Sequence, residues 1–229
     1  MLTISNLTVS YGKHKVLENI SLNLTLGQIH GFAGLNGSGK TTLLNTIFGF
    51  VVPDNGQVQI GQKPIEKGSI GYLETQNYLY HRLTISEFVG LFVSNSLVKF
   101  ELNDWMKVLN LNGNEVTDEL STGMRKKVAL LCLIAQDKNL LLLDEPFNGL
   151  DMESVLILNL VLKELKKAGK TILITSHIIE TLTENCDQIH TLVQGKIEAS
   201  YFPNDFEKLK TEFLGDFMVK ASTQVENLF

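Results

Sequence analysis

The chain has 229 residues, of which 44% are hydrophobic and 20% are charged. This composition suits one α/β domain with a buried core and excludes a disordered or fibrous chain. Its formal net charge of -5 provides no broad basic field to attract a nucleic-acid backbone, so we expect no nucleic-acid partner.

The first third of the chain alternates predicted strands with turns. Alternating apolar residues over Leu2–Val9 indicate a strand and not a signal peptide, and further strands are predicted at Asn19–Leu26 and Gln28–Ala33. The longest purely apolar stretch, Val128–Ala135, is far shorter than the ~20 residues that cross a bilayer. We therefore expect a cytoplasmic protein.

A helix is predicted from about Gly39 to Phe48, and the turn Pro53–Gly56 leads into strands at Gln57–Ile60 and Ser69–Leu73. Helical spacing of apolar residues over Thr84–Leu111 then predicts an inserted helical subdomain. The apolar residues that carry this spacing include Phe88, Leu91, Phe92, Leu97 and Val98.

After Asp118 the pattern returns to alternating helices and strands. Leu140–Asp144 and Thr171–Ser176 are apolar without alternation, as expected for parallel strands that helices cover on both faces. Helices are predicted from 118 to Ala135 and over Met152–Ala168 and Ile178–Asn185. Short connections between these elements are typical of parallel α/β architecture.

The last elements are a hairpin of Gln188–Val193 and Lys196–Ser200 and a helical tail over Phe206–Phe229. Cys132 and Cys186 lack metal-ligand spacing and are interpreted as core residues. We divide the single domain, 1–229, into a nucleotide-binding core (1–75 and 137–204), a helical subdomain (76–136) and a tail (205–229).

A glycine-rich segment between the strand Gln28–Ala33 and the next helix fits the phosphate-loop pattern. Exposed backbone N–H groups at a helix N-terminus favour a polyanion. Lys40 then neutralises the β- and γ-phosphates of ATP, Thr41 binds Mg²⁺ and Thr42 reaches the α-phosphate. The predicted phosphate-binding residues are Gly34, Leu35, Asn36, Gly37, Ser38, Gly39, Lys40, Thr41 and Thr42.

Two adjacent carboxylates, Asp144 and Glu145, follow the apolar run Leu140–Leu143. The carboxyl end of a buried parallel strand is where ligands bind in open sheets. We predict that Asp144 holds Mg²⁺ and that Glu145 takes a proton from the water that attacks the γ-phosphate. A helix cap or a solvated surface pair is the alternative interpretation for these acids alone.

Between these motifs lies Leu120-Ser121-Thr122-Gly123-Met124. It resembles the Leu-Ser-Gly-Gly-Gln segment of ABC transporter ATP-binding subunits, in which the segment binds ATP held by the opposite protomer. Ser121 and Gly123 match, whereas Thr122 and Met124 depart from the pattern. The resemblance implies a P-loop NTPase (RecA-like) α/β core with an antiparallel β subdomain and an inserted α-helical subdomain. Taken alone, Ser121 would be a helix cap.

The resemblance extends over Tyr11 to Lys196 and implies further site residues. Tyr11 matches the aromatic residue that stacks on adenine, and Asp151 the residue that crosses to the partner protomer. His177 matches the histidine that contacts the γ-phosphate and holds Glu145. We assign the residue that senses Mg²⁺ and water to Gln76, although the loop spacing also allows Glu74 or Thr75. Each residue also has an interpretation without a functional role: Tyr11 as a strand-end residue, Asp151 as a helix cap, His177 as an ordinary histidine and Gln76 as part of an exposed polar loop.

The same resemblance implies the partners. A second copy, or a related ATPase subunit, closes head to tail around two ATP molecules, and separate integral membrane permease subunits receive the movement. The chain would then be peripheral on the inner face of the membrane, with export favoured over import. A soluble ABC ATPase that acts on ribosomes or chromosomes is the alternative, and a regulatory module without turnover is a second one.

Overall fold

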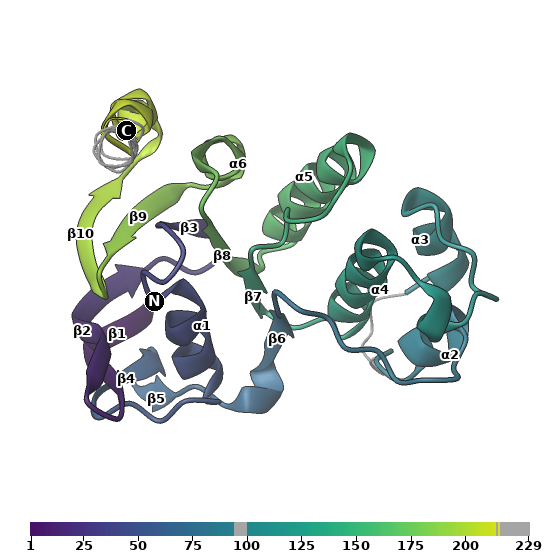
Figure 1. The fold of residues 1–229 in the computed structure, drawn as a ribbon, viewed down its shortest axis with the longest axis horizontal. Coiled ribbons are helices and arrows are strands. Elements are labelled where there is room, and N and C mark those ends of the chain that lie inside the picture. The colour runs from purple at the N-terminus through teal and green to yellow at the C-terminus, as the bar shows by residue number, and fades with distance from the viewer. Residues whose placement is uncertain (94–99, 214, 216–229) are drawn as a thin grey trace, which may run out of the picture.

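The computed structural model describes residues 1–93, 100–213 and 215 and contains two β-sheets (Figure 1). The smaller sheet is antiparallel with the strand order β2-β1-β4-β5. β2 begins at His14, before the predicted Asn19, where it pairs with Tyr11 of β1. The sequence did not predict this earlier start, because the first residues of β2 are polar and exposed and carry no alternating pattern. The strands are β1 (Leu2–Tyr11), β2 (His14–Leu24), β4 (Asn55–Ile60) and β5 (Lys63–Pro64).

The larger sheet has six strands in the order β10-β9-β3-β8-β7-β6, and all neighbours are parallel except β9 and β10. Every residue of the central strands β3, β8 and β7 is buried, as predicted for strands with helices on both faces. The strands are β3 (Ile29–Ala33), β6 (Ile70–Leu73), β7 (Leu140–Asp144), β8 (Thr171–Ser176), β9 (Gln188–Val193) and β10 (Lys196–Tyr201).

Helices lie on both faces of the larger sheet. In Figure 1, α1 lies between this sheet and the antiparallel one, whereas α5 and α6 lie on the opposite side. The α-helices are α1 (Lys40–Phe48), α2 (Ile85–Gly90), α3 (Leu102–Val108), α4 (Thr122–Ala135), α5 (Met152–Lys167) and α6 (Ile179–Asn185). Short 3-10 helices cover Lys67–Ser69, Thr117–Glu119 and Pro203–Asp205.

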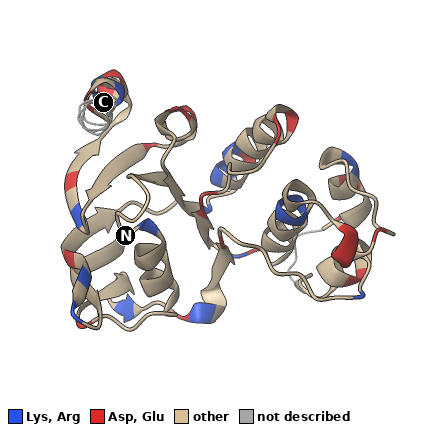
Figure 2. Ribbon diagram, in the orientation of Figure 1, with Lys and Arg blue, Asp and Glu red and all other residues tan. Residues whose placement is uncertain are grey.

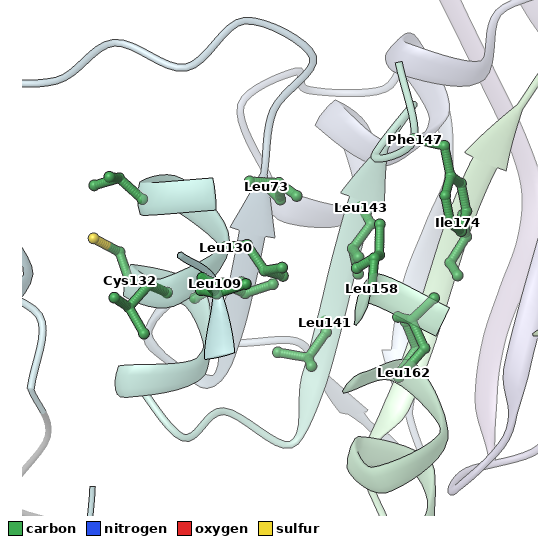
Figure 3. Close-up of a cluster of buried hydrophobic side chains, with 14 of the residues drawn as sticks. Leu73, Leu109, Leu130, Cys132, Leu141, Leu143, Phe147, Leu158, Leu162 and Ile174 are labelled. Carbon is green, nitrogen blue, oxygen red and sulfur yellow. The ribbon is translucent and has the colours of Figure 1, made fainter. Parts of the chain in front are cut away.

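The side chains of β7 divide between two hydrophobic clusters. Leu140 and Leu142 pack in the cluster beneath the antiparallel sheet, whereas Leu141 and Leu143 pack in the cluster under α4 and α5. Figure 3 shows the second cluster, in which Leu158 of α5 lies beside the strand. The run of leucines therefore carries no alternation because both faces of the strand are buried.

Among its described residues, the inserted region contains two short helices, α2 and α3, at Thr84–Leu111. A capping box starts α2, because the Thr84 hydroxyl accepts from the Glu87 N–H while the Glu87 carboxylate accepts from the Thr84 N–H. Leu97 and Val98 lie outside the described residues. Of the predicted tail, 206–213 is helical and packs Phe206 into the core, and 214 and 216–229 are not described.

Two histidines, His30 on β3 and His190 on β9, are fully buried side by side. Burial lowers the pKa of both imidazoles, to about 3 for His190. An unfolded histidine has a pKa near 6.5, so the unfolded chain binds protons first as the pH falls. We expect the free energy of unfolding to decrease from about pH 6.5 downward, by about 1 kcal/mol from His190 alone at pH 5.5.

Urea unfolding at pH 7.5 and 5.5 measures this dependence. His190→Gln removes the titrating group and keeps an amide that can bond Ser200, the partner of the His190 Nδ1 at 2.7 Å. The variant is expected to lose the part of the pH dependence that His190 contributes, whereas the part from His30 remains. An unchanged slope in the variant would contradict this interpretation.

Candidate active site

The segment Gly34–Gly39 forms a loop between β3 and α1, at the carboxyl end of the sheet. Glycine is required at Gly34, because a Cβ there would lie 2.4 Å from the Leu192 carbonyl oxygen. Gly39 has a φ of 107° and provides no side-chain cap for α1. The first N–H groups of α1 are therefore available to an anion. The Ser38 hydroxyl is buried without a hydrogen-bond partner, which also fits a phosphate acceptor.

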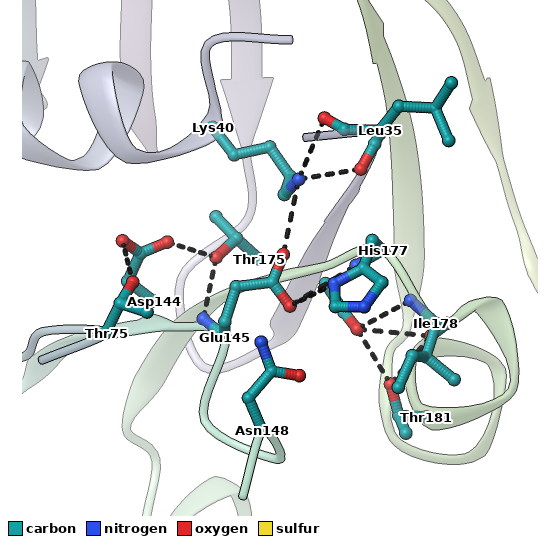
Figure 4. Close-up of polar contacts among 12 residues, drawn as sticks. Leu35, Lys40, Thr75, Asp144, Glu145, Asn148, Thr175, His177, Ile178 and Thr181 are labelled. Carbon is teal, nitrogen blue, oxygen red and sulfur yellow. Dashed lines mark hydrogen bonds and ion pairs between the residues drawn. The ribbon is translucent and has the colours of Figure 1, made fainter. Parts of the chain in front are cut away.

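Lys40, the first residue of α1, turns back over this loop. Its Nζ donates to the carbonyl oxygens of Gly34 at 2.7 Å and Leu35 at 3.2 Å. The same ammonium lies 3.2 Å from Oε1 of Glu145, and both side chains are almost fully buried. The buried Lys40 ammonium in this loop is therefore paired with the Glu145 carboxylate (Figure 4).

Three threonine hydroxyls surround Asp144 at the end of β7. Oδ2 accepts from Thr41 at 2.7 Å and from Thr75 at 2.6 Å, and Oδ1 accepts from Thr175 at 2.6 Å. Carboxylate and hydroxyl oxygens are the hard donors that Mg²⁺ prefers beside phosphate. Asp144, Thr41 and Thr75 therefore fit a magnesium ion at this position.

Glu145 follows directly and adopts a left-handed backbone, with φ of 49°. Its N–H donates to the Thr175 hydroxyl at 3.0 Å. One carboxylate oxygen faces Lys40, and the other lies 3.0 Å from Nδ1 of His177 (Figure 4). Because the carboxylate is held at two points and largely buried, it can accept a proton without reorientation.

The loop after β6 places Thr75, and not Gln76, against Asp144. The Gln76 side chain points elsewhere, since its Oε1 accepts from the Tyr78 hydroxyl at 2.8 Å and the residue is exposed. The assignment of the Mg²⁺-sensing position to Gln76 stays a prediction, and Thr75, one of the alternatives that the sequence left open, is the loop residue that contacts Asp144. The loop has no helical or strand periodicity, so the sequence did not reveal which residue faces inward.

Ser121 and Asp151 lie at the starts of α4 and α5. The Ser121 hydroxyl caps α4 by accepting from the Met124 N–H at 3.3 Å, and the Asp151 carboxylate caps α5 through the Ser154 N–H at 2.8 Å. This hydrogen bonding holds the pKa of Asp151 below its usual value. In Figure 1, α4 and α1 lie on opposite sides of β6 and β7. Gly123 packs beside the carbonyl of Gly149.

Tyr11 lies where β1 turns into β2, opposite His14, and is 53% exposed. Its stacking on adenine stays a prediction. Thr175 was missed by sequence reasoning, because a hydroxyl in a buried strand gives no signal of its partner. The register that pairs it with Asp144 across β7 and β8 supplies that information.

Comparison with known proteins identifies relatives of the whole chain. The profile of the ABC transporter family matches residues 17–148, more than half of the chain. An uncharacterised ABC transporter ATP-binding protein of Methanocaldococcus jannaschii is 32% identical over 84% of this chain and 74% of its own length. The lipopolysaccharide export system ATP-binding protein LptB of Haemophilus influenzae is 30% identical, with 94% and 98% covered. ABC transporter G family member 20 of Dictyostelium discoideum is 33% identical over 96% of this chain but only 32% of its own length.

Solved structures resemble the fold closely. The ATP-binding subunit of an ABC transporter superposes with a TM-score of 0.84 at 25% identity, covering 97% of this chain and 99% of that one. An ATP-binding cassette determined as a dimer in a post-hydrolysis state with ADP and Pi gives a TM-score of 0.78 at 26% identity, covering 89% and 99%. CbiO1 from Clostridium perfringens, part of the transporter complex CbiONQ, gives 0.76 at 25% identity, covering 91% of both chains.

Proposed function

The chain belongs to the ABC transporter family and is an ABC-type ATPase, and we propose that it closes on ATP with a second cassette and so moves separate membrane permease subunits. The observation that carries this proposal is that α4, which Ser121 caps, and α1, which follows the phosphate loop, lie on opposite sides of β6 and β7 in Figure 1. Each copy then needs the other's segment to enclose its nucleotide. The dimeric post-hydrolysis structure of a similar cassette supports this arrangement.

In the proposed reaction the loop N–H groups and Lys40 bind the triphosphate of ATP. Mg²⁺, when bound by Thr41 and Asp144, supplies charge neutralisation at the phosphates. Phosphate and Glu145 compete for the Lys40 ammonium, so nucleotide binding frees a Glu145 oxygen to accept a proton from water. His177 keeps the other oxygen in place. Loss of the γ-phosphate then weakens closure, because the ligand no longer favours the closed state.

Thr75→Val is expected to raise the Mg²⁺ concentration for half-maximal turnover by about 3- to 10-fold, because the variant removes an oxygen that contacts Asp144. Gln76→Ala is the matched control in the same loop and should change it less than about 2-fold, since surface side chains away from a site have small effects. A magnesium titration of ATPase activity separates the two. A larger effect at Gln76 would support the sequence prediction of Gln76 over Thr75.

We place the permease contact on the helical subdomain, where a groove of about 200 Å³ runs beside the loop after β6. Tyr78 is 83% exposed and Tyr80 is 65% exposed next to this groove. Large exposed apolar side chains beside a groove are typical of a protein-binding site. Thr75 belongs to the same loop, so a movement of the permease contact would reach the metal site directly.

Site-directed crosslinking tests the transporter proposal. Both natural cysteines are buried, so Tyr78→Cys introduces an accessible thiol for a photoactivated crosslinker, with Asn55→Cys on β4 as the control. In membranes from the source cells, Tyr78→Cys is expected to crosslink to an integral membrane protein and the control is not. Crosslinking to ribosomal or chromosomal components from Tyr78→Cys would support the alternative instead.

Outward transport is the direction that we propose, on the basis of similarity to the export protein LptB. Cells lacking the chain should then retain substrate inside, whereas loss of an importer depletes it. The ribosomal and chromosomal alternative finds no support among the reported relatives, which are transporter proteins.

Among the described residues no helix is long and apolar enough to cross a bilayer. Charges of both signs are interspersed over the ribbon in the view of Figure 2.

A further inference from the structure

A buried lysine contacts the loop that carries Glu145, although it belongs to neither the phosphate loop nor the metal site. Lys126 lies near the start of α4 and is only 4% exposed. Its Nζ donates to the carbonyl oxygens of Glu145 and Asn148, each at 2.8 Å. Lysine is almost never buried this deeply unless polar groups satisfy it. These two carbonyls therefore determine where the ammonium lies.

The backbone of Glu145 needs such support. A glutamate with φ of 49° lies in a sparsely populated region, which persists only where surrounding contacts hold it. The Thr175 hydroxyl accepts a hydrogen bond from the N–H of Glu145 at 3.0 Å. The carbonyl oxygen of Glu145 accepts one from the N–H of Asn148 at 3.2 Å. With Lys126 bound to that carbonyl as well, contacts from three sides hold the peptide groups of the strained residue.

We propose that Lys126 is a positioning residue for ATP hydrolysis, whose ammonium holds the Glu145 and Asn148 carbonyls and so keeps the Glu145 carboxylate directed at Lys40 and His177. Since Ser121 caps the same helix, a displacement of α4 moves both the Ser121–Gly123 segment and this lysine. In the proposed dimer, ATP held by the partner would contact the Ser121–Gly123 segment and so affect Glu145 through α4. This part of the inference rests on the proposed function. The positioning of Glu145 requires only the contacts within one chain.

The positive charge of Lys126 lies near the carboxylates of Glu145 and Asp144. Four charged or titratable side chains face or adjoin the Glu145 carboxylate: Lys40, His177, Asp144 and Lys126. Burial lowers the pKa of Lys126, whereas the charges of Glu145 and Asp144 raise it. The ammonium therefore supplies a positive charge beside these two buried carboxylates, in addition to its hydrogen bonds to the backbone.

The test compares Lys126→Met, Lys126→Gln and Lys126→Arg in the full chain, with the exposed Lys163→Met on α5 as the control. Lys126→Met is expected to lower kcat by about 10- to 100-fold with the KM for ATP within about 3-fold, because a displaced catalytic group affects chemistry more than binding. Lys126→Arg retains the charge and the donors and should restore kcat to within about 3-fold.

Amide hydrogen exchange supplies a readout that does not depend on turnover. Peptides covering 144–150 should exchange faster in Lys126→Gln and Lys126→Met and remain unchanged in Lys163→Met, because the Asn148 N–H bonds the carbonyl that Lys126 holds. Should Lys126→Met not fold, the Gln variant provides the same comparisons. Unchanged kcat and exchange in Lys126→Gln, or equal losses of kcat in the Arg and Gln variants, would overturn the proposal.

Discussion

Glu145→Gln is expected to lower ATP turnover by about 10²- to 10⁴-fold, the contribution that a positioned general base makes to catalysis. Glutamine matches glutamate in shape, so its carbonyl oxygen can still face Lys40 and its amide can donate to Nδ1 of His177. ATP binding should therefore persist. A cassette that binds ATP without cleaving it should accumulate as the closed dimer.

Turnover assays and size-exclusion chromatography with ATP and Mg²⁺ measure both parts of this expectation. Glu164→Gln on α5 is the matched control, because that carboxylate is exposed and pairs with the neighbouring surface Lys167 at 2.7 Å. The control should turn over ATP and elute as the wild type does. Turnover by Glu145→Gln within about 2-fold of the wild type would exclude Glu145 as the base.

Where a physical cause acts locally along the chain, the fold could be predicted from the sequence. The leucine run of β7 predicted a strand buried on both faces, and its side chains do divide between two clusters. Glycine at Gly34 could be assigned to a phosphate loop because the motif and its place between strand and helix agree. Asp144 and Glu145 could be chosen as candidate site residues because they lie at the carboxyl end of a buried parallel strand.

The predictions that were incomplete concern residues whose roles depend on distant neighbours. Thr175 holds Asp144 only because β8 pairs with β7 in one register. Thr75 contacts Asp144 from a loop without periodicity, so the sequence could not distinguish it from Gln76, which was chosen for the chemistry of its amide side chain. Lys126 reads as one of several basic residues on a helix, and its burial depends on how α4 packs over the loop after β7.

Lys40→Met should abolish high-affinity ATP binding and also destabilise the protein without nucleotide. The Lys40–Glu145 pair is buried, with side-chain exposures of 6% and 9%. Removal of one partner of a buried pair leaves an uncompensated charge and costs about 3–5 kcal/mol. His177 contacts the other Glu145 oxygen at 3.0 Å and offsets a part of this, so a loss near the lower end is expected.

The double variant Lys40→Met/Glu145→Gln separates the two effects, because it removes the uncompensated carboxylate along with the cation. Thermal unfolding should show a Tm for Lys40→Met lower by about 6 °C or more, most of which the double variant regains. ATP binding, measured by calorimetry, should stay lost in both, since neither carries a cation for the phosphates. If the double variant were as unstable as Lys40→Met, the lysine would stabilise the loop through the carbonyls of Gly34 and Leu35 and not through Glu145. The competition between phosphate and carboxylate for one ammonium would then no longer explain how nucleotide binding frees the base.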